Sequence, residues 1–189
     1  MHGYIEHGVA QFQTLDLMRA TLLYLICSMA LILDAYAVDT GERFTTVAGI
    51  SLDKTTISDI QKKLGPSKIV VTGDASLYDA RISYDIRGGT IQFFQGEMND
   101  GVGECVTTDR SIKPCSPWPK NAPIPQVNIA GLQLGISEDQ FRKVVNRPVQ
   151  WRGYIATVHF EGRGWIDING IFYNGRLIQF EIVKTTSDG

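Results

Sequence analysis

Apolar and polar positions follow two patterns along this chain, and both patterns occur twice in the same order. The stretch Gly49–Pro66 spaces its apolar residues as a helix does, and strand-like alternation runs for about forty residues behind it. A loose copy returns as Gly131–Pro148, again followed by strand-like alternation. Both copies open with Gly, alternate apolar residues up to a Leu and stop at a Pro. The pattern predicts one small α+β unit that is used twice.

The first helix is expected at Thr56–Leu64. Thr55 or Thr56 can accept a hydrogen bond from a free N–H group of the first turn, and Asp59 would lie near the positive end of the helix. Ile57, Ile60 and Leu64 fall on one apolar stripe. Gly65 and the proline after it end the helix.

The second helix has a stronger start signal. Ser137 and Gln140 have the spacing of a capping box, and Phe141, Val144 and Val145 form its apolar stripe. It ends at Asn146, a residue that also adopts the left-handed cap conformation.

Period-two alternation predicts the strands. They are expected at Lys68–Thr72, Leu77–Arg87, Thr90–Gln95 and Glu104–Thr108 in the first unit, and at Val149–Phe160, Trp165–Tyr173 and Leu177–Lys184 in the second. Tyr154, Ala156, Val158 and Phe160 are expected to share one face. The predicted fold class is therefore α+β, with two tandem repeats, each a short amphipathic helix packed on a three- to four-stranded antiparallel β-meander.

A proline-rich segment separates the two units. Five of the chain's seven prolines lie within residues 111–126, where fixed φ angles stiffen the chain. The predicted organisation is a first repeat over 38–110, a linker over 111–126 and a second repeat over 127–189.

Residues 1–37 have the three parts of a secretory signal peptide. Arg19 precedes the uncharged apolar run Ala20–Leu33, and an Ala-x-Ala site ends at Ala37. The run is short for a permanent membrane span, although an uncleaved anchor is the alternative. Met18 is a better initiator than Met1 for such a signal. A periplasmic or secreted location is expected.

Charge sets limits on the partner. Without residues 1–37 the chain has 17 basic and 17 acidic residues and contains no basic run. Net neutrality gives no electrostatic basis for binding nucleic acid. Contact with a membrane is expected only through an uncleaved signal or through a partner.

Two cysteines remain after export, Cys105 and Cys115. In an oxidising compartment an isolated pair this close in sequence is expected to form a disulfide, which stabilises the fold by about 2–3 kcal/mol through the unfolded state.

Catalytic patterns are not found. His159 is the one histidine beyond residue 37, and it lies in a predicted strand where it should point outward. The chain has no G-x-S-x-G, no Cys–His pair and no H-E-x-x-H. A loop at 97–104 contains acids without the EF-hand spacing, so calcium binding is only a weak alternative. We expect no enzyme, no cofactor and no metal site.

The recurring string of a hydroxyl residue, helical apolar positions, Gly-x-Pro and an aromatic-x-Gly hairpin also carries a resemblance. Its clearest parts are Leu134–Ser137 and Tyr173–Arg176 in the second unit and Leu64–Pro66 and Phe94–Gly96 in the first. The chain resembles exported bacterial tandem domains of the β-lactamase inhibitory protein type. It is also similar to the small outer-membrane lipoproteins of the SmpA/OmlA family, although their acylated cysteine has no counterpart here. The resemblance implies a fold and a compartment more than an activity.

A binding surface is predicted on the sheet faces opposite the helices, because Arg, Trp and Tyr are enriched at interface hot spots. The candidate residues are Arg81, Asp85, Arg87, Phe94, Trp151, Arg152, Arg163, Trp165, Asp167 and Tyr173. The alternative is that the tryptophans pack into the core. The first functional hypothesis is an exported, non-catalytic module that binds another protein through this surface, and that could inhibit an enzyme. The second is a structural component of a cell-envelope assembly.

Overall fold

The computed structural model describes residues 39–74, 77–96, 100–119, 124–162 and 164–185. A compact unit begins at Thr40. The predicted signal peptide, residues 1–37, lies outside the described residues. Among the helices described, none is long and apolar enough to cross a membrane.

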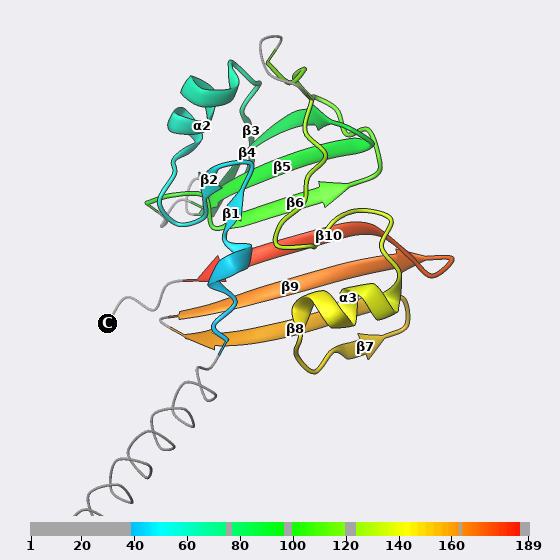
Figure 1. The fold of residues 1–189 in the computed structure, drawn as a ribbon. Helices are drawn as coiled ribbons and strands as arrows, with labels where there is room; N and C mark the ends of the chain where they lie inside the picture. Colours follow the sequence, from blue (N-terminus) through cyan, green and yellow to red (C-terminus); the bar gives the residue numbers. More distant parts are fainter. Residues whose placement is uncertain (1–38, 75–76, 97–99, 120–123, 163, 186–189) are drawn as a thin grey trace, which may run out of the picture. The chain divides into compact units, whose positions relative to one another are not determined.

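The described chain folds into short helices and a large sheet (Figure 1). The helical elements are η1 (Glu42–Phe44), α2 (Ile57–Leu64) and α3 (Glu138–Val145). The strands are β1 (Thr46–Val47), β2 (Ile50–Ser51), β3 (Val70–Asp74), β4 (Leu77–Ile86), β5 (Gly89–Gly96), β6 (Glu104–Thr108), β7 (Gln150–Arg152), β8 (Ile155–Gly162), β9 (Gly164–Tyr173) and β10 (Arg176–Thr185).

Within the described residues, eight strands form one sheet in the order β3-β4-β5-β6-β10-β9-β8-β7. Every neighbouring pair is antiparallel. The predicted α+β class with antiparallel sheet is therefore confirmed. The pairing of β6 with β10 joins the strands that follow α2 to those that follow α3, so both halves share one sheet.

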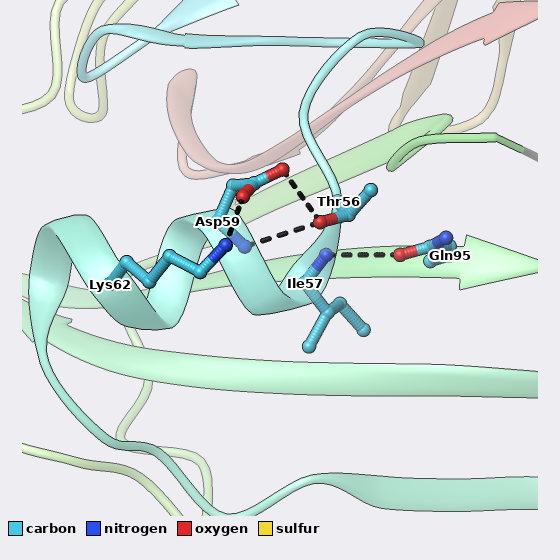
Figure 2. Close-up of polar contacts among 5 residues, drawn as sticks. All are labelled: Thr56, Ile57, Asp59, Lys62 and Gln95. Atoms are coloured by element: carbon cyan, nitrogen blue, oxygen red, sulfur yellow. Dashed lines mark hydrogen bonds and ion pairs between the residues drawn. The ribbon is translucent and has the colours of Figure 1, made fainter.

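The start of α2 follows the sequence prediction. Thr56 is the N-cap, and its hydroxyl accepts a hydrogen bond from the Asp59 N–H at 3.2 Å. The Asp59 carboxylate also accepts hydrogen bonds from the Thr56 hydroxyl, at 2.8 Å, and from the Lys62 ammonium, at 2.9 Å (Figure 2). The Ile57 N–H donates to the Gln95 side chain of β5 at 3.0 Å, which fixes the helix end to the sheet.

The capping box of α3 is also confirmed. The Ser137 hydroxyl accepts from the Gln140 N–H, and the Gln140 side chain accepts from the Ser137 N–H. The helix ends at Asn146, whose φ of 50° is left-handed.

Both helices lie on the same face of the sheet. Phe141 of α3 packs edge-on against Phe172 at 5.5 Å between ring centroids, and the C-cap carbonyl of α2, on Gly65, accepts a hydrogen bond from the Tyr84 hydroxyl. Cross-strand pairing connects these positions, because Tyr84 begins a row of facing residues that continues through Ile91, Thr107, Phe180, Gly170 and Ala156. Most of this row is fully buried, and it is the centre of the core.

The segment before α2 belongs to the fold, although no helix or strand was predicted for it. Phe44 of η1 is fully buried and lies 5.6 Å from the Phe160 ring. The Arg43 guanidinium donates to the carbonyls of Val144 and Val145, the last residues of α3, each at 3.1 Å. Phe44 and Arg43 therefore hold this segment against the second half of the molecule.

The long strand predicted at Val149–Phe160 is wrong. It is two strands, β7 and β8, that pair as a hairpin with Trp151 opposite Ala156. Gly153 has a φ of 63°, which a turn accepts and a strand does not. Tyr154 lies in this turn and is 65% exposed, so it does not share the buried face of Ala156 and Phe160.

The proline-rich segment lies against β4. The Ser116 N–H donates to the Ser83 carbonyl, and the Asp85 N–H donates to the Ser116 carbonyl. Trp118 packs edge-on against Tyr84, with 6.2 Å between ring centroids. The Arg87 N–H donates to the Pro125 carbonyl at 3.1 Å. Ser116 and Pro125 thus extend the hydrogen bonding of β4 beyond the end of β3.

Candidate functional site

The side of the sheet opposite α2 and α3, here called the open face, carries the candidate site. Residues directly opposite each other on antiparallel strands point to the same side. One row of such residues crosses the open face in the order Arg81, Phe94, Glu104, Val183, Asp167 and His159. The strands around the β6–β10 junction therefore bring residues far apart in sequence onto one surface.

Part of the open face is covered by the chain itself. Thr90 and Thr108 are buried although they point to this side. The Ile112 N–H donates to the Thr90 hydroxyl, and Ser83 and Gln92 are buried with a 2.9 Å hydrogen bond between their side chains. The more accessible part therefore comprises the end of β4, β5 and β6 at Arg81, Phe94 and Glu104, together with β10, β9 and β8.

A chain of polar side chains crosses that accessible part. The Thr157 hydroxyl donates to the Asn169 carbonyl oxygen at 3.0 Å, and the Asn169 amide donates to the Glu181 carboxylate at 2.7 Å. Glu181 in turn hydrogen-bonds Glu104. This polar ladder spans β8, β9, β10 and β6, and it orients each side chain through its neighbour.

Glu104 and Glu181 form an acid pair at the β6–β10 junction. Glu104 lies opposite Val183 and Glu181 lies opposite Val106, so the two acids are diagonal neighbours on one face. Burial, the hydrogen bond to Glu181 and the charges of Glu181 and Asp79 together raise the pKa of Glu104 to about 8, and burial is the largest of these causes. The pair therefore holds a proton at neutral pH.

His159 lies at the end of the same row. Its Nδ1 is 2.6 Å from the Asp167 carboxylate, and its Nε2 is 3.9 Å from the Glu161 carboxylate. It is exposed, as the alternation in its strand predicted. The imidazole therefore sits between two acids on the surface.

Apolar and cationic groups flank the acids. The Arg81 guanidinium lies 5.9 Å from the centroid of the Phe94 ring, its cross-strand partner. Trp165, near the start of β9, is 43% exposed, and Tyr173, at the end of the same strand, is 67% exposed. The open face thus combines a central acid pair with aromatic side chains near its periphery.

The predicted surface residues do not all meet on this face. Arg81, Phe94, Trp165 and Asp167 lie on its accessible part, and Arg152 and Tyr173 lie on the same side at the strand ends near the β7–β8 and β9–β10 turns. Asp85 also points to this side, but its side chain is in contact with Cys115, which hydrogen-bonds it. Arg87 is exposed at the end of β4, and Arg163 lies outside the described residues.

Trp151 is on the other side of the sheet, contrary to its predicted place. It is opposite Ala156, packs against Phe172 at 5.3 Å between ring centroids, and is covered by the Arg142 guanidinium at 4.9 Å. One predicted alternative, packing into the core, therefore holds for Trp151 and not for Trp165. The reason is the turn at Gly153, which sets the pairing register of β7.

No protein-family model, curated protein or solved structure matches this chain. The chemistry of the site is therefore the basis for a proposed function.

The predicted disulfide is wrong: Cys105 and Cys115 are both free thiols. The reason is that they lie on opposite sides of the sheet. Cys105 is opposite Phe93 and Ile182, within the core. Cys115 contacts the side chains of Asp85 and Thr90, which point to the open face. Burial raises the pKa of both thiols, to about 11 for Cys115, so neither is a reactive thiolate.

Metal ligands do not converge in the part of the chain that the structure describes: no group of three or more His, Cys, Asp or Glu side chains could hold an ion there. Part of the acid loop at 97–104 lies outside the described residues. The weak calcium alternative therefore gains no support.

The acid pair was not among the predicted site residues. Alternation along β10 puts Glu181 opposite in direction to Phe180 and Ile182, and this signal was present in the sequence. What local alternation could not supply is the pairing of β6 with β10, which places Glu104 beside Glu181.

Proposed function

We propose that this protein is an exported, non-catalytic module that binds another protein through the open face of its sheet. The observation that carries the proposal is the accessible surface around the acid pair, where charged, aromatic and apolar side chains are fixed on paired strands. Rigid strands hold such groups with little loss of conformational entropy on binding.

The charges of this face favour a basic partner surface. The acidic side chains Asp79, Glu104, Glu161, Asp167 and Glu181 point to the open face, and the basic side chains Arg81, Arg152 and Arg176 share it, the last two at the strand ends. Complementary potentials steer encounter and suppress wrong partners. The partner is therefore a protein that presents lysine or arginine side chains around an apolar centre. An enzyme with a basic active-site rim fits this description, in which case binding inhibits it.

Export is part of the same proposal. The apolar run Ala20–Leu33 and the site at Ala37 precede the compact unit, which begins at Thr40. Cleavage after Ala37 would leave the folded unit whole.

The tandem-repeat interpretation also belongs here. Helix α2 is followed by strands β3 to β6, and α3 is followed by β7 to β10. This order supports an origin from one helix-and-meander unit used twice, as in the inhibitor-type domains that the sequence resembles. The second candidate, a component of an envelope assembly, rests on the similarity to outer-membrane lipoproteins.

Affinity capture with a variant of the face tests the binding proposal. The tagged protein is incubated with cell-envelope and culture-supernatant extracts, beside a Trp165→Ala/Asp167→Asn double variant and a Tyr154→Ala control. Tyr154 is as exposed as the face aromatics but lies in the β7–β8 turn. We expect a basic protein to bind wild type and control, to be released by about 0.5 M salt, and to be lost by the double variant.

Equal capture by a correctly folded double variant would show that the open face is not the site. Fractionation separates the two candidates, because a soluble binding module stays in the supernatant whereas an envelope component sediments with membranes.

A further inference from the structure

The two edges of the sheet differ in how they are protected. Strand β7 has three residues, follows Pro148, and has the Arg142 guanidinium over its Trp151. Short length, a nearby proline and charged residues are the usual devices that prevent an edge strand from pairing with another chain. The edge at β7 is therefore blocked.

Strand β3, at the opposite edge (Figure 1), has none of these devices over Ile69–Thr72. Ile69 is 45% exposed and Val71 is 59% exposed, although both are large apolar residues with high β-propensity. In the described part of the chain, β3 pairs with β4 alone. No backbone hydrogen bond from a turn or loop reaches Val70–Thr72 in that part either.

An outer edge of this kind presents alternating N–H and C=O groups that only water or another extended chain can satisfy. The exposed side chains of Ile69 and Val71 point to the same side, because they are two residues apart in extended backbone. The surface is thus a strand edge with an apolar ridge beside it, and its natural partner is another strand with the same two features.

We propose that β3 pairs with β3 of a second copy of this chain, antiparallel and about a two-fold axis through Val70, so that one continuous sheet crosses a homodimer. Centring on Val70 places Ile69 of each copy opposite Val71 of the other. A two-fold axis perpendicular to the sheet keeps the α2 side of both copies together, so the two apolar ridges meet. Lys68 then lies opposite Thr72.

Charge and closure both favour this arrangement. No ionisable side chain lies within Ile69–Thr72. The two Lys68 residues lie four positions apart along the pair, about 13 Å at 3.3 Å per residue, which is beyond the screening length of physiological salt. Because the β7 edge is blocked, pairing stops at two copies and does not continue into a fibre.

The expected affinity is low. A standard stable interface buries about 1,600 Å², and a pair of five-residue strands with two Ile–Val contacts buries considerably less. A dissociation constant between about 10 µM and about 1 mM is therefore expected.

Sedimentation equilibrium of the purified protein between about 1 µM and about 1 mM tests the dimer. We expect Val71→Lys and, separately, Ile69→Lys to weaken it at least about tenfold, because each places an ammonium in an apolar contact. Both side chains are exposed, so folding, checked by circular dichroism, should be unchanged. Tyr154→Lys is the matched control on the other half and should dimerise as wild type does.

A cysteine pair tests the register. Val70→Cys should give a disulfide-linked dimer on mild oxidation, because directly opposite Cβ atoms lie about 5 Å apart. Thr72→Cys has the same background thiols but places the two new cysteines four positions apart, so it should not cross-link. A wild-type protein that stays monomeric at about 1 mM, or a dimer that Val71→Lys leaves intact, would overturn the proposal.

Discussion

Replacing Glu104 by Gln tests the acid pair at the centre of the open face. The pKa of Glu104 is raised from its ordinary value of 4.5 to about 8, first because the carboxyl is buried and second because Glu181 is beside it. The folded protein therefore holds this proton up to about pH 8, whereas the unfolded chain releases it near 4.5. Between these values the folded state binds more protons, so raising the pH favours unfolding.

The sign of the effect is thus opposite to that of an ordinary salt-bridged carboxylate. The stability linked to this proton is fully present below about pH 4.5 and is lost as the pH rises through about 8. The full difference in pKa would correspond to about 5 kcal/mol at 1.4 kcal/mol per pH unit. The Glu104 side chain is partly exposed, and solvent screening reduces this to about 1–2 kcal/mol.

A glutamine at position 104 keeps the shape and donates an N–H to the Glu181 carboxylate at every pH. We expect Glu104→Gln to have wild-type stability at about pH 5 and to be more stable than wild type by about 1–2 kcal/mol at about pH 8. Urea unfolding followed by circular dichroism at both pH values measures the difference. Comparing the two proteins cancels the contribution of other acids, such as Asp53, whose pKa burial also raises.

The matched control is Glu161→Gln, which removes an exposed acid from the same face. It should not reproduce the gain in stability at about pH 8 that is expected for Glu104→Gln. If wild type and Glu104→Gln lose stability in parallel between these pH values, the two carboxyls do not share a proton and the geometry of the acid pair is wrong.

Three further changes test the core and the thiols. Ile60→Asp should lower stability by several kcal/mol, because Ile60 is fully buried on α2, and an unchanged melting temperature would mean that this helix is not docked as described. Phe44→Ala should lower the free energy of unfolding, measured in urea, by about 3–5 kcal/mol, because it removes the contact with Phe160. A decrease below about 1 kcal/mol would mean that η1 does not pack in the core. Alkylation without prior reduction should modify Cys115 in the native protein more slowly than a free thiol, because its pKa is raised to about 11, and should modify Cys105 only after unfolding; a peptide that contains both residues in a disulfide would contradict their placement on opposite faces.

Local patterns in the sequence identified most of the elements. Helical spacing and a hydroxyl cap placed α2 within one residue of its start, and the capping box at Ser137 placed α3. These signals are local, since a cap and its first turn are formed by residues three apart. The hairpin at Gly153 was missed although its signal is also local: the apolar positions are Val149 and Trp151 before the turn and Ala156, Val158 and Phe160 after it, a change of phase that a continuous strand does not have.

Cross-strand contacts could not be found in the same way. Periodicity tells which residues share a face of one strand, and it does not tell which strand lies beside it. The prediction that Cys105 and Cys115 are bonded used only their separation in sequence. Their separation by the sheet follows from the alternation of β6 and from the course of the chain over Thr90. The acid pair likewise depends on a strand pairing between residues more than seventy positions apart.

The β6–β10 junction connects the stability of the fold with the proposed binding face. On one side of the sheet it continues the core, where Thr107 faces Phe180 and Cys105 faces Ile182. On the other side it brings Glu104 next to Glu181. A basic group of a partner placed over this pair would favour loss of the shared proton, because a nearby positive charge stabilises the carboxylate. Binding of such a partner should therefore release protons near pH 7 and weaken as the pH falls, so that the same carboxyl that stabilises the free protein when protonated favours the complex when ionised.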